Sequence, residues 1–180
     1  ANTSQIIVTV GAIEGLAASV MAVIDPGDEI ILPTPTYSTH ITQVKLASGK
    51  PILVPLAEEK DFALDLEAIK NAITGKTKAI LFCTPNNPTG TVFPETTLRE
   101  LGKIALEHNL TLIADEAYEY FTYDDNEHFS MASIPELSKN IITNYTFTKT
   151  YAMTGWRIGY AGGPVELVKA MAKVQSQQTS

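Results

Sequence analysis

Residues 79–118 read AILFCTPNNPTGTVFPETTLRELGKIALEHNLTLIADEAY, and this stretch decides the fold. The apolar run Ala79–Cys83 is typical of a buried strand, and a second such run follows at Thr111–Ala114. Between them, Thr84–Gly90 is a loop rich in Pro, Asn and Gly, and Pro94 suits the first turn of a helix. The apolar side chains of that helix share one side: Leu98, Leu101, Ile104 and Ala105. A strand, a helix and another strand in this order predict two parallel strands joined by a crossover helix.

The same alternation extends in both directions along the chain. Further strands are expected at Ile6–Thr9 (buried), Glu29–Leu32, Pro51–Leu56, Ile141–Tyr145 and Ile158–Ala161. Helices are expected over Gly11–Ile24, after an N-cap at Asp65, and after Pro164. Tyr123–Glu136 is the least regular segment and is expected to be a surface excursion. The sequence therefore predicts a three-layer α/β/α sandwich around a mostly parallel, seven-stranded sheet.

Composition narrows the class of protein. The 180 residues carry a net charge of -7, from 13 basic and 20 acidic residues, and no Lys/Arg cluster stands out. Nucleic acid and anionic membranes are therefore poor candidates as partners. The most apolar stretch, Leu16–Ile24, is too short to cross a bilayer. Cys83 is the only cysteine, which excludes a disulfide framework and fits a reducing cytoplasm; it is expected to be a buried core residue.

Chemically useful residues follow the predicted strands. They are Gly11-Ala12-Ile13, Tyr37, Asn86-Asn87, Asp115-Glu116-Ala117-Tyr118, Thr146-Phe147-Thr148-Lys149 and, in the turn into the last strand, Arg157. Each alone has an ordinary explanation: a tight turn at Gly11, a helix cap at Asp115, a solvated charge at Lys149. In an open parallel sheet, however, ligands bind at the carboxyl ends of the strands. All these groups fall on that edge, so together they predict a single pocket.

The contents of this pocket specify a ligand. Main-chain N–H groups at a helix start, an arginine and two hydroxyls make a phosphate site. An aromatic face can stack on a flat ring, a carboxylate can pair with a ring N–H⁺, and a tyrosine with an asparagine can bond one ring oxygen. A lysine can form an imine. A phosphorylated pyridine with an aldehyde and a phenolic oxygen satisfies all of these groups.

The chain resembles the large domain of the fold type I pyridoxal-phosphate enzymes, the class I/II aminotransferases, over essentially its whole length. The resemblance rests on Thr9–Gly15, Pro33–Tyr37, Pro85–Gly90, Asp115–Tyr118, and Thr146–Lys149 through Gly155–Gly159. It implies that residues 1–180 form a pyridoxal-phosphate-binding large domain whose last strand is antiparallel. It also implies an excerpt, with an N-terminal segment and a C-terminal small domain lying outside it. Alone, such an excerpt is expected to have little or no activity.

The resemblance also assigns roles. Lys149 would form an imine with the cofactor and move protons, Asp115 would keep the pyridine nitrogen protonated, and these two with Tyr118 would be the catalytic residues. Tyr118 and Asn87 would bond the phenolic oxygen, and Tyr37 would stack on the ring. The phosphate would be held by the main chain of Gly11, Ala12 and Ile13, with Thr146, Thr148 and Arg157. Threonines at 146 and 148 stand where the family frequently has serines, but the hydroxyl remains.

The implied reaction is transfer of an amino group between an amino acid and a 2-oxo acid by a cytoplasmic homodimer without a metal. A lyase or decarboxylase of the same fold, and the aminotransferase-like ligand sensor of a transcription regulator, remain alternatives. A short-chain dehydrogenase is disfavoured, since Tyr145 and Lys149 have its spacing but lie among strand formers. Of the histidines, His40 is expected at the surface or pocket rim, His108 near a helix end, and His128 in the irregular segment.

Overall fold

The computed structural model describes residues 2–178, and its seven strands follow one another as the sequence predicts. The strands are β1 (Ile6–Thr9), β2 (Glu29–Thr34), β3 (Lys50–Pro55), β4 (Thr77–Cys83), β5 (Thr111–Asp115), β6 (Ile141–Thr146) and β7 (Gly159–Gly162). The helices are α1 (Gly11–Val23), α2 (Ser38–Leu46), α3 (Leu66–Asn71), α4 (Glu95–Glu107), α5 (Phe147–Thr150) and α6 (Val165–Gln178). Predicted and observed strand ends differ by up to two residues.

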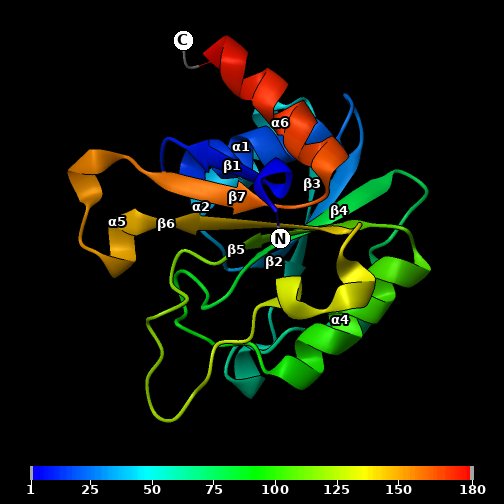
Figure 1. The fold of residues 1–180 in the computed structure, drawn as a ribbon. Helices are drawn as coiled ribbons and strands as arrows, with labels where there is room; N and C mark the ends of the chain where they lie inside the picture. The colour runs from blue at the N-terminus through cyan, green and yellow to red at the C-terminus, as the bar shows by residue number, and fades with distance from the viewer. Residues whose placement is uncertain (1, 179–180) are drawn as a thin grey trace.

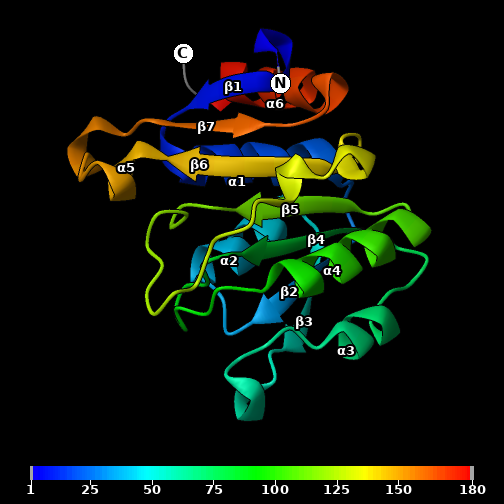
Figure 2. The same ribbon diagram turned by 60° about the horizontal axis from the view of Figure 1, so that its bottom comes forward.

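The strands form one seven-stranded sheet in the order β1-β7-β6-β5-β4-β2-β3 (Figures 1 and 2). Strands β2 to β6 are parallel to their neighbours within that group, whereas β7 is antiparallel to both β1 and β6. The predicted sandwich, its seven strands and its antiparallel last strand are therefore confirmed. Strand β4 is apolar over Ala79–Cys83 and buried there, as expected of a parallel strand covered on both faces.

Two helical layers cover the sheet. On one face α1 and α2 pack over β2, β4 and β5, while α6 packs against α1 and β1. On the other face α4 packs over β4 and β5, and α3 lies beside β3 and packs against α4 (Figure 2). The cap of α3 is the predicted one, because the side chain of Asp65 accepts a 2.9 Å hydrogen bond from the Ala68 N–H. Pro94 and Pro164 stand immediately before α4 and α6 rather than within their first turns.

Three local expectations are wrong. Strand β1 is not buried on both faces: α1 and α6 cover only one of them, so Ile7 and Thr9 are buried while Val8 is 68% exposed. Helix α2 was not anticipated, because its Ser, Thr and β-branched residues give only a weak helical pattern. The predicted excursion Tyr123–Glu136 stays at the surface only as far as residue 130, since Met131 and Ile134 are buried in the core.

Among residues 2–178, no helix is long and apolar enough to span a membrane.

Candidate functional site

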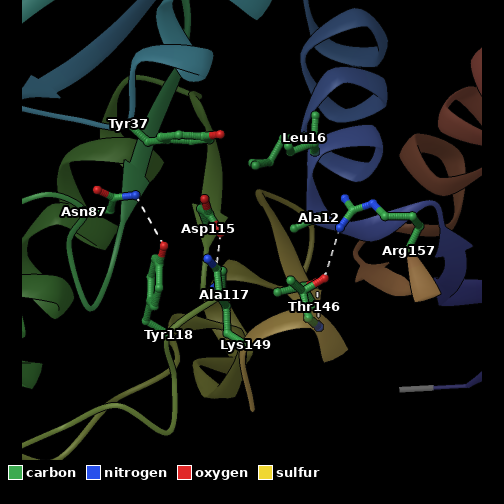
Figure 3. A pocket seen from close by; sticks show the side chains of 12 residues that line it. Ala12, Leu16, Tyr37, Asn87, Asp115, Ala117, Tyr118, Thr146, Lys149 and Arg157 are labelled. Atoms are coloured by element: carbon green, nitrogen blue, oxygen red, sulfur yellow. Dashed lines mark hydrogen bonds between the residues drawn. The ribbon is translucent and has the colours of Figure 1, made fainter. Parts of the chain in front are cut away.

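A cavity of about 230 Å³ opens at the carboxyl ends of the parallel strands, where the sequence places its polar residues. It is lined by Ala12, Ile13, Leu16, Tyr37, Asn87, Asp115, Ala117, Tyr118, Thr146, Thr148, Lys149 and Arg157. Figure 3 shows the ring of Tyr37 along one side, with Asn87 and Tyr118 on one flank and Thr146 and Arg157 on the other. The structure thus brings together groups that are up to 145 positions apart in the chain.

One wall of the cavity is the start of α1. Gly11 opens this 13-residue helix in the left-handed region, at a φ of +68°, which suits glycine. A Cβ atom at Gly11 would lie 2.5 Å from Nη2 of Arg157, so only glycine lets the guanidinium approach the helix start this closely. The unpaired N–H groups of the first turn and the adjacent arginine make this wall positive.

The hydroxyls of this wall come from the end of β6 and the start of α5. Thr146 caps α5 by accepting a hydrogen bond of 3.2 Å from the Thr148 N–H. Thr148 in turn accepts a 3.3 Å bond from Nη1 of Arg157, and that same nitrogen donates to the Thr154 carbonyl at 3.2 Å. The guanidinium and both hydroxyls are therefore held near the start of α1.

Asp115 lies at the opposite end of the cavity and is almost fully buried. Its Oδ1 accepts a bond of 3.1 Å from the Ala117 N–H, and its Oδ2 lies 3.0 Å from Nε2 of His40. Nδ1 of His40 is 2.9 Å from the Thr36 hydroxyl. This chain of contacts fixes the orientation of the carboxylate from behind.

His40 is the principal functional contact that sequence reasoning missed. His40 was expected at the surface or the pocket rim, but it is completely buried on α2. Its ring and the ring of Tyr37 lie edge to face, with their centroids 5.7 Å apart. The spacing of three residues between Tyr37 and His40 was the available signal, because residues three apart share one helix face.

Lys149 reaches the cavity from α5. Its Nζ lies 5.5 Å from the ring centroid of Tyr118, and within residues 2–178 it forms no ion pair. The hydroxyl of Tyr118 accepts a bond of 3.3 Å from the Asn87 side chain. A free amine, a phenol and an amide therefore meet at one place beside Asp115.

A second, more open cavity of about 560 Å³ adjoins the first and shares Asn87, Tyr118, Thr148 and Lys149 with it. Its other walls include Pro85, Pro88, Phe121 and Tyr123, so the approach to the lysine is largely apolar and aromatic. Cys83 is a buried core residue, as the sequence predicts. Its burial, followed by the charge of Asp115, raises the pKa of its thiol. Among the described residues, no cluster of His, Cys, Asp or Glu is placed to hold a metal ion.

The chain is similar in sequence to known proteins that are longer than it is. A probable aspartate/prephenate aminotransferase of Aquifex aeolicus is 44% identical over 178 residues, and an aspartate aminotransferase of Bacillus subtilis is 43% identical over 178 residues. Each match covers 98% of this chain but 45% of the relative. The chain therefore spans about half the length of the curated relatives it matches.

Solved structures agree with the fold. The Thermus thermophilus aspartate aminotransferase with maleate superposes with a TM-score of 0.96 at 41% identity, covering 99% of this chain and 46% of that one. N-Succinyldiaminopimelate aminotransferase from Mycobacterium tuberculosis gives a TM-score of 0.95 at 35% identity, over 98% and 46% of the two chains. The family model described as aminotransferase class I and II matches residues 1–180. Because this match runs the whole length of the chain and the structural likeness is equally complete, the chain belongs to the class I and II aminotransferases.

Proposed function

We propose that the protein containing this chain is a pyridoxal-phosphate-dependent aminotransferase, and that residues 1–180 form its cofactor-binding large domain. The observation that carries the proposal is the meeting, in one cavity, of an unpaired lysine, a buried carboxylate and a positive helix start. Figure 3 shows Asp115 and Lys149 on one side of Thr146 and Arg157, with the ring of Tyr37 along the cavity.

The donor set of the cavity fits this cofactor. The N–H groups of Ala12 and Ile13, the hydroxyls of Thr146 and Thr148, and Arg157 offer a phosphate both donors and positive charge. The missing side chain at Gly11 lets the Arg157 guanidinium lie against the helix start, where it can share such a group with the N–H donors. The flat face of Tyr37 suits a pyridine ring.

Away from the helix start, Asp115 also lines the cavity and is suited to bond a protonated ring nitrogen. When bound, pyridoxal phosphate supplies an electron sink for the substrate's α-carbon. Asp115 would support that chemistry by holding a proton on the ring nitrogen. His40 and the Ala117 N–H keep the carboxylate aimed into the cavity.

Lys149 is suited to two tasks. Its amine would hold the cofactor by condensing with the aldehyde, with loss of water, and as a free amine it would carry a proton to and from the substrate's α-carbon. Tyr118 and Asn87 are suited to bond the phenolic oxygen of the ring, because their polar atoms meet next to the lysine.

The relatives support a choice of substrate. Several carry aspartate in their names, and others are named for prephenate or aromatic amino acids. We therefore propose aspartate as the first amino donor to test, with a 2-oxo acid as acceptor. The proposal also includes a cytoplasmic homodimer acting on these small molecules, without a nucleic-acid or membrane partner; the acidic net charge of -7 is consistent with it.

The test is covalent trapping in the full-length protein. Borohydride treatment should fix pyridoxal phosphate on Lys149, as located by mass spectrometry of the digested protein, and Lys149→Ala should abolish the label. A label on Lys139 or Lys169 would refute the assignment. A panel of amino acids, with the products identified, then separates amino transfer, which yields the 2-oxo acid, from decarboxylation or elimination.

A further inference from the structure

A second buried cluster lies beside Asp115, on the opposite side of strand β5. Glu116 is 1% exposed, and both of its carboxylate oxygens are bonded. Oε1 accepts a bond of 2.9 Å from the Ser130 hydroxyl, and Oε2 lies 3.2 Å from Nε2 of His128. The proposed reaction uses neither Glu116 nor His128, so this buried carboxylate calls for a separate explanation.

The cluster continues to strand β6. The Tyr145 hydroxyl is 3.4 Å from the Ser130 hydroxyl. Since the single hydrogen of Ser130 points to Glu116, Tyr145 is the donor of this contact. Burial, followed by the charge of Glu116, raises the pKa of Tyr145, which keeps this hydroxyl protonated as a donor. The Tyr145 ring stacks on Tyr160 of β7, with centroids 4.7 Å apart.

The positions of these partners in the chain show that the cluster joins the two ends of one loop. His128 and Ser130 lie 12 and 14 residues after Glu116, at the point where the chain returns from its surface excursion. The segment of residues 116–130 therefore begins at Glu116, and the Glu116 side chain also bonds His128 and Ser130 at its other end. This is the arrangement of a compact surface loop whose ends are close together. In Figure 2 the excursion is the yellow-green segment that follows β5 and projects beyond the strand ends.

Residues of this loop form part of the walls of both cavities. Tyr118 lines both cavities, and Phe121 and Tyr123 line the larger one. The other internal bonds of the loop are all local: the N–H groups of Glu119, Phe121 and Asn126 donate to the carbonyls of Glu116, Tyr118 and Tyr123 at 3.1, 2.8 and 3.1 Å, and the Asn126 side chain also donates to the Tyr123 carbonyl at 2.8 Å. Residues 123–127 are exposed. Ala117 is buried and Phe129 packs against the core, so both ends of the loop have an apolar anchor. The residues between them belong to no core cluster, and their order depends on how the ends of the loop are held together.

We propose that Glu116 is a positioning residue: by holding His128 and Ser130 it closes the loop of residues 116–130, and thereby keeps Tyr118 beside Asn87 and Lys149. The part of this proposal that concerns loop order is independent of the proposed function. The part that concerns Tyr118 and a bound cofactor rests on it.

The first measurement is hydrogen exchange of the cofactor-free, full-length protein. Glu116→Met removes both acceptors at similar volume, and amides of residues 118–130 should exchange at least tenfold faster, whereas those of β4 and β5 should change less than threefold. His128→Leu, a milder change, should give a smaller effect in the same residues. Glu116→Gln and His128→Gln keep one polar atom for the contact and should recover most of the protection.

A matched control separates positioning from general destabilisation. Glu29 is also a buried carboxylate, 5% exposed, held by a hydroxyl (Thr74, 2.6 Å) and a basic side chain (Lys50, 3.1 Å), but it lies at the start of β2. Glu29→Met should loosen its own surroundings and leave exchange in residues 118–130 unchanged. Equal acceleration of the loop in Glu29→Met, or an unchanged loop in both Glu116→Met and His128→Leu, would overturn the proposal.

The second measurement is the absorbance spectrum of added pyridoxal phosphate. If Glu116 positions Tyr118, Glu116→Met should shift the spectrum in the same direction as Tyr118→Phe, and Glu29→Met should not. A spectrum identical to that of the unaltered protein would refute the link between Glu116 and Tyr118. Failure of the unaltered protein to bind the cofactor would instead refute the proposed function, and hydrogen exchange would still decide the loop closure.

Discussion

Gly159 offers a sharp test of how tightly the cavity is built, because an added methyl group there would meet only backbone. A Cβ atom at Gly159 would lie 2.6 Å from the Tyr145 carbonyl oxygen, 2.8 Å from the carbonyl carbon of Gly11 and 2.9 Å from the nitrogen of Ala12. Ordinary contact begins at 3.4 Å, so β6 and the start of α1 would have to move apart from β7 by about 0.8 Å at the closest approach. None of these backbone atoms can turn aside as a flexible side chain can.

The expected cost of Gly159→Ala follows from two opposing effects. Overpacking of this kind costs about 3 kcal/mol. Gly159 does not have a positive φ, so alanine also restricts the unfolded chain and returns about 0.5–1 kcal/mol. The net loss of unfolding free energy is therefore about 2 kcal/mol. The displaced helix start should also weaken pyridoxal-phosphate binding by about tenfold or more, equivalent to about 1.4 kcal/mol.

The assay is urea unfolding of the full-length protein together with a cofactor titration followed by absorbance. Gly162→Ala is the matched control: it lies on the same strand, and its added Cβ would meet nothing closer than the Gln5 carbonyl at 3.7 Å. Its stability and affinity should stay close to those of the unaltered protein. If Gly159→Ala behaves like Gly162→Ala in both measurements, the close approach of β7 to α1 does not shape the cavity.

Three further predictions concern carboxylates and their partners. Asp115→Asn should fold normally but lose about a hundredfold or more in turnover, roughly 3 kcal/mol, and near-native turnover would make Asp115 a structural cap. His40→Leu leaves the buried Asp115 with one hydrogen-bond donor and should lower the unfolding free energy by about 2–3 kcal/mol in urea, with His40→Gln recovering part; equal stability of the leucine variant would contradict the contact. Bonds from Thr74 and Lys50 lower the pKa of Glu29 below 4.5, so Glu29 should stabilise the fold above about pH 4.5 and lose that effect as the pH falls through its folded-state pKa. The stability difference between the unaltered protein and Glu29→Gln should therefore shrink in acid, and a difference independent of pH would contradict this origin.

The layers and the edge of the sheet that holds the cavity could be predicted from the sequence, because both follow from local patterns. Apolar runs such as Ala79–Cys83 identify covered parallel strands, and parallel strands present their carboxyl ends on one edge. Ten of the predicted site residues line the cavity, while Gly11 stands beside Arg157 without being part of the lining. Their chemical roles remain predictions.

The remaining features depend on contacts between distant parts of the chain. His40 is buried because Asp115, 75 positions away, needs a partner, and no local pattern encodes that need. The exposure of Val8 depends on α1 and α6 covering only the other face of β1, and that coverage is not written in the run Ile6–Thr9. The partnership of Glu116 with His128 likewise appears only when the loop closes on itself.

The position of β1 in the sheet also has a consequence for the chain as it leaves the ribosome. Within residues 2–178, β1 and α1 are synthesised before the other strands and helices, but the one strand that pairs with β1 is β7, about 150 residues later, and α6 follows β7. Strands β2 to β5 can pair while α1 still lacks most of its packing partners, which exposes apolar surface in the nascent chain. The lining of the cavity extends from Ala12 to Arg157, so it is incomplete until Arg157 has been synthesised. A ligand of this cavity would therefore bind only chains whose synthesis has passed Arg157, and would stabilise those chains selectively over shorter ones.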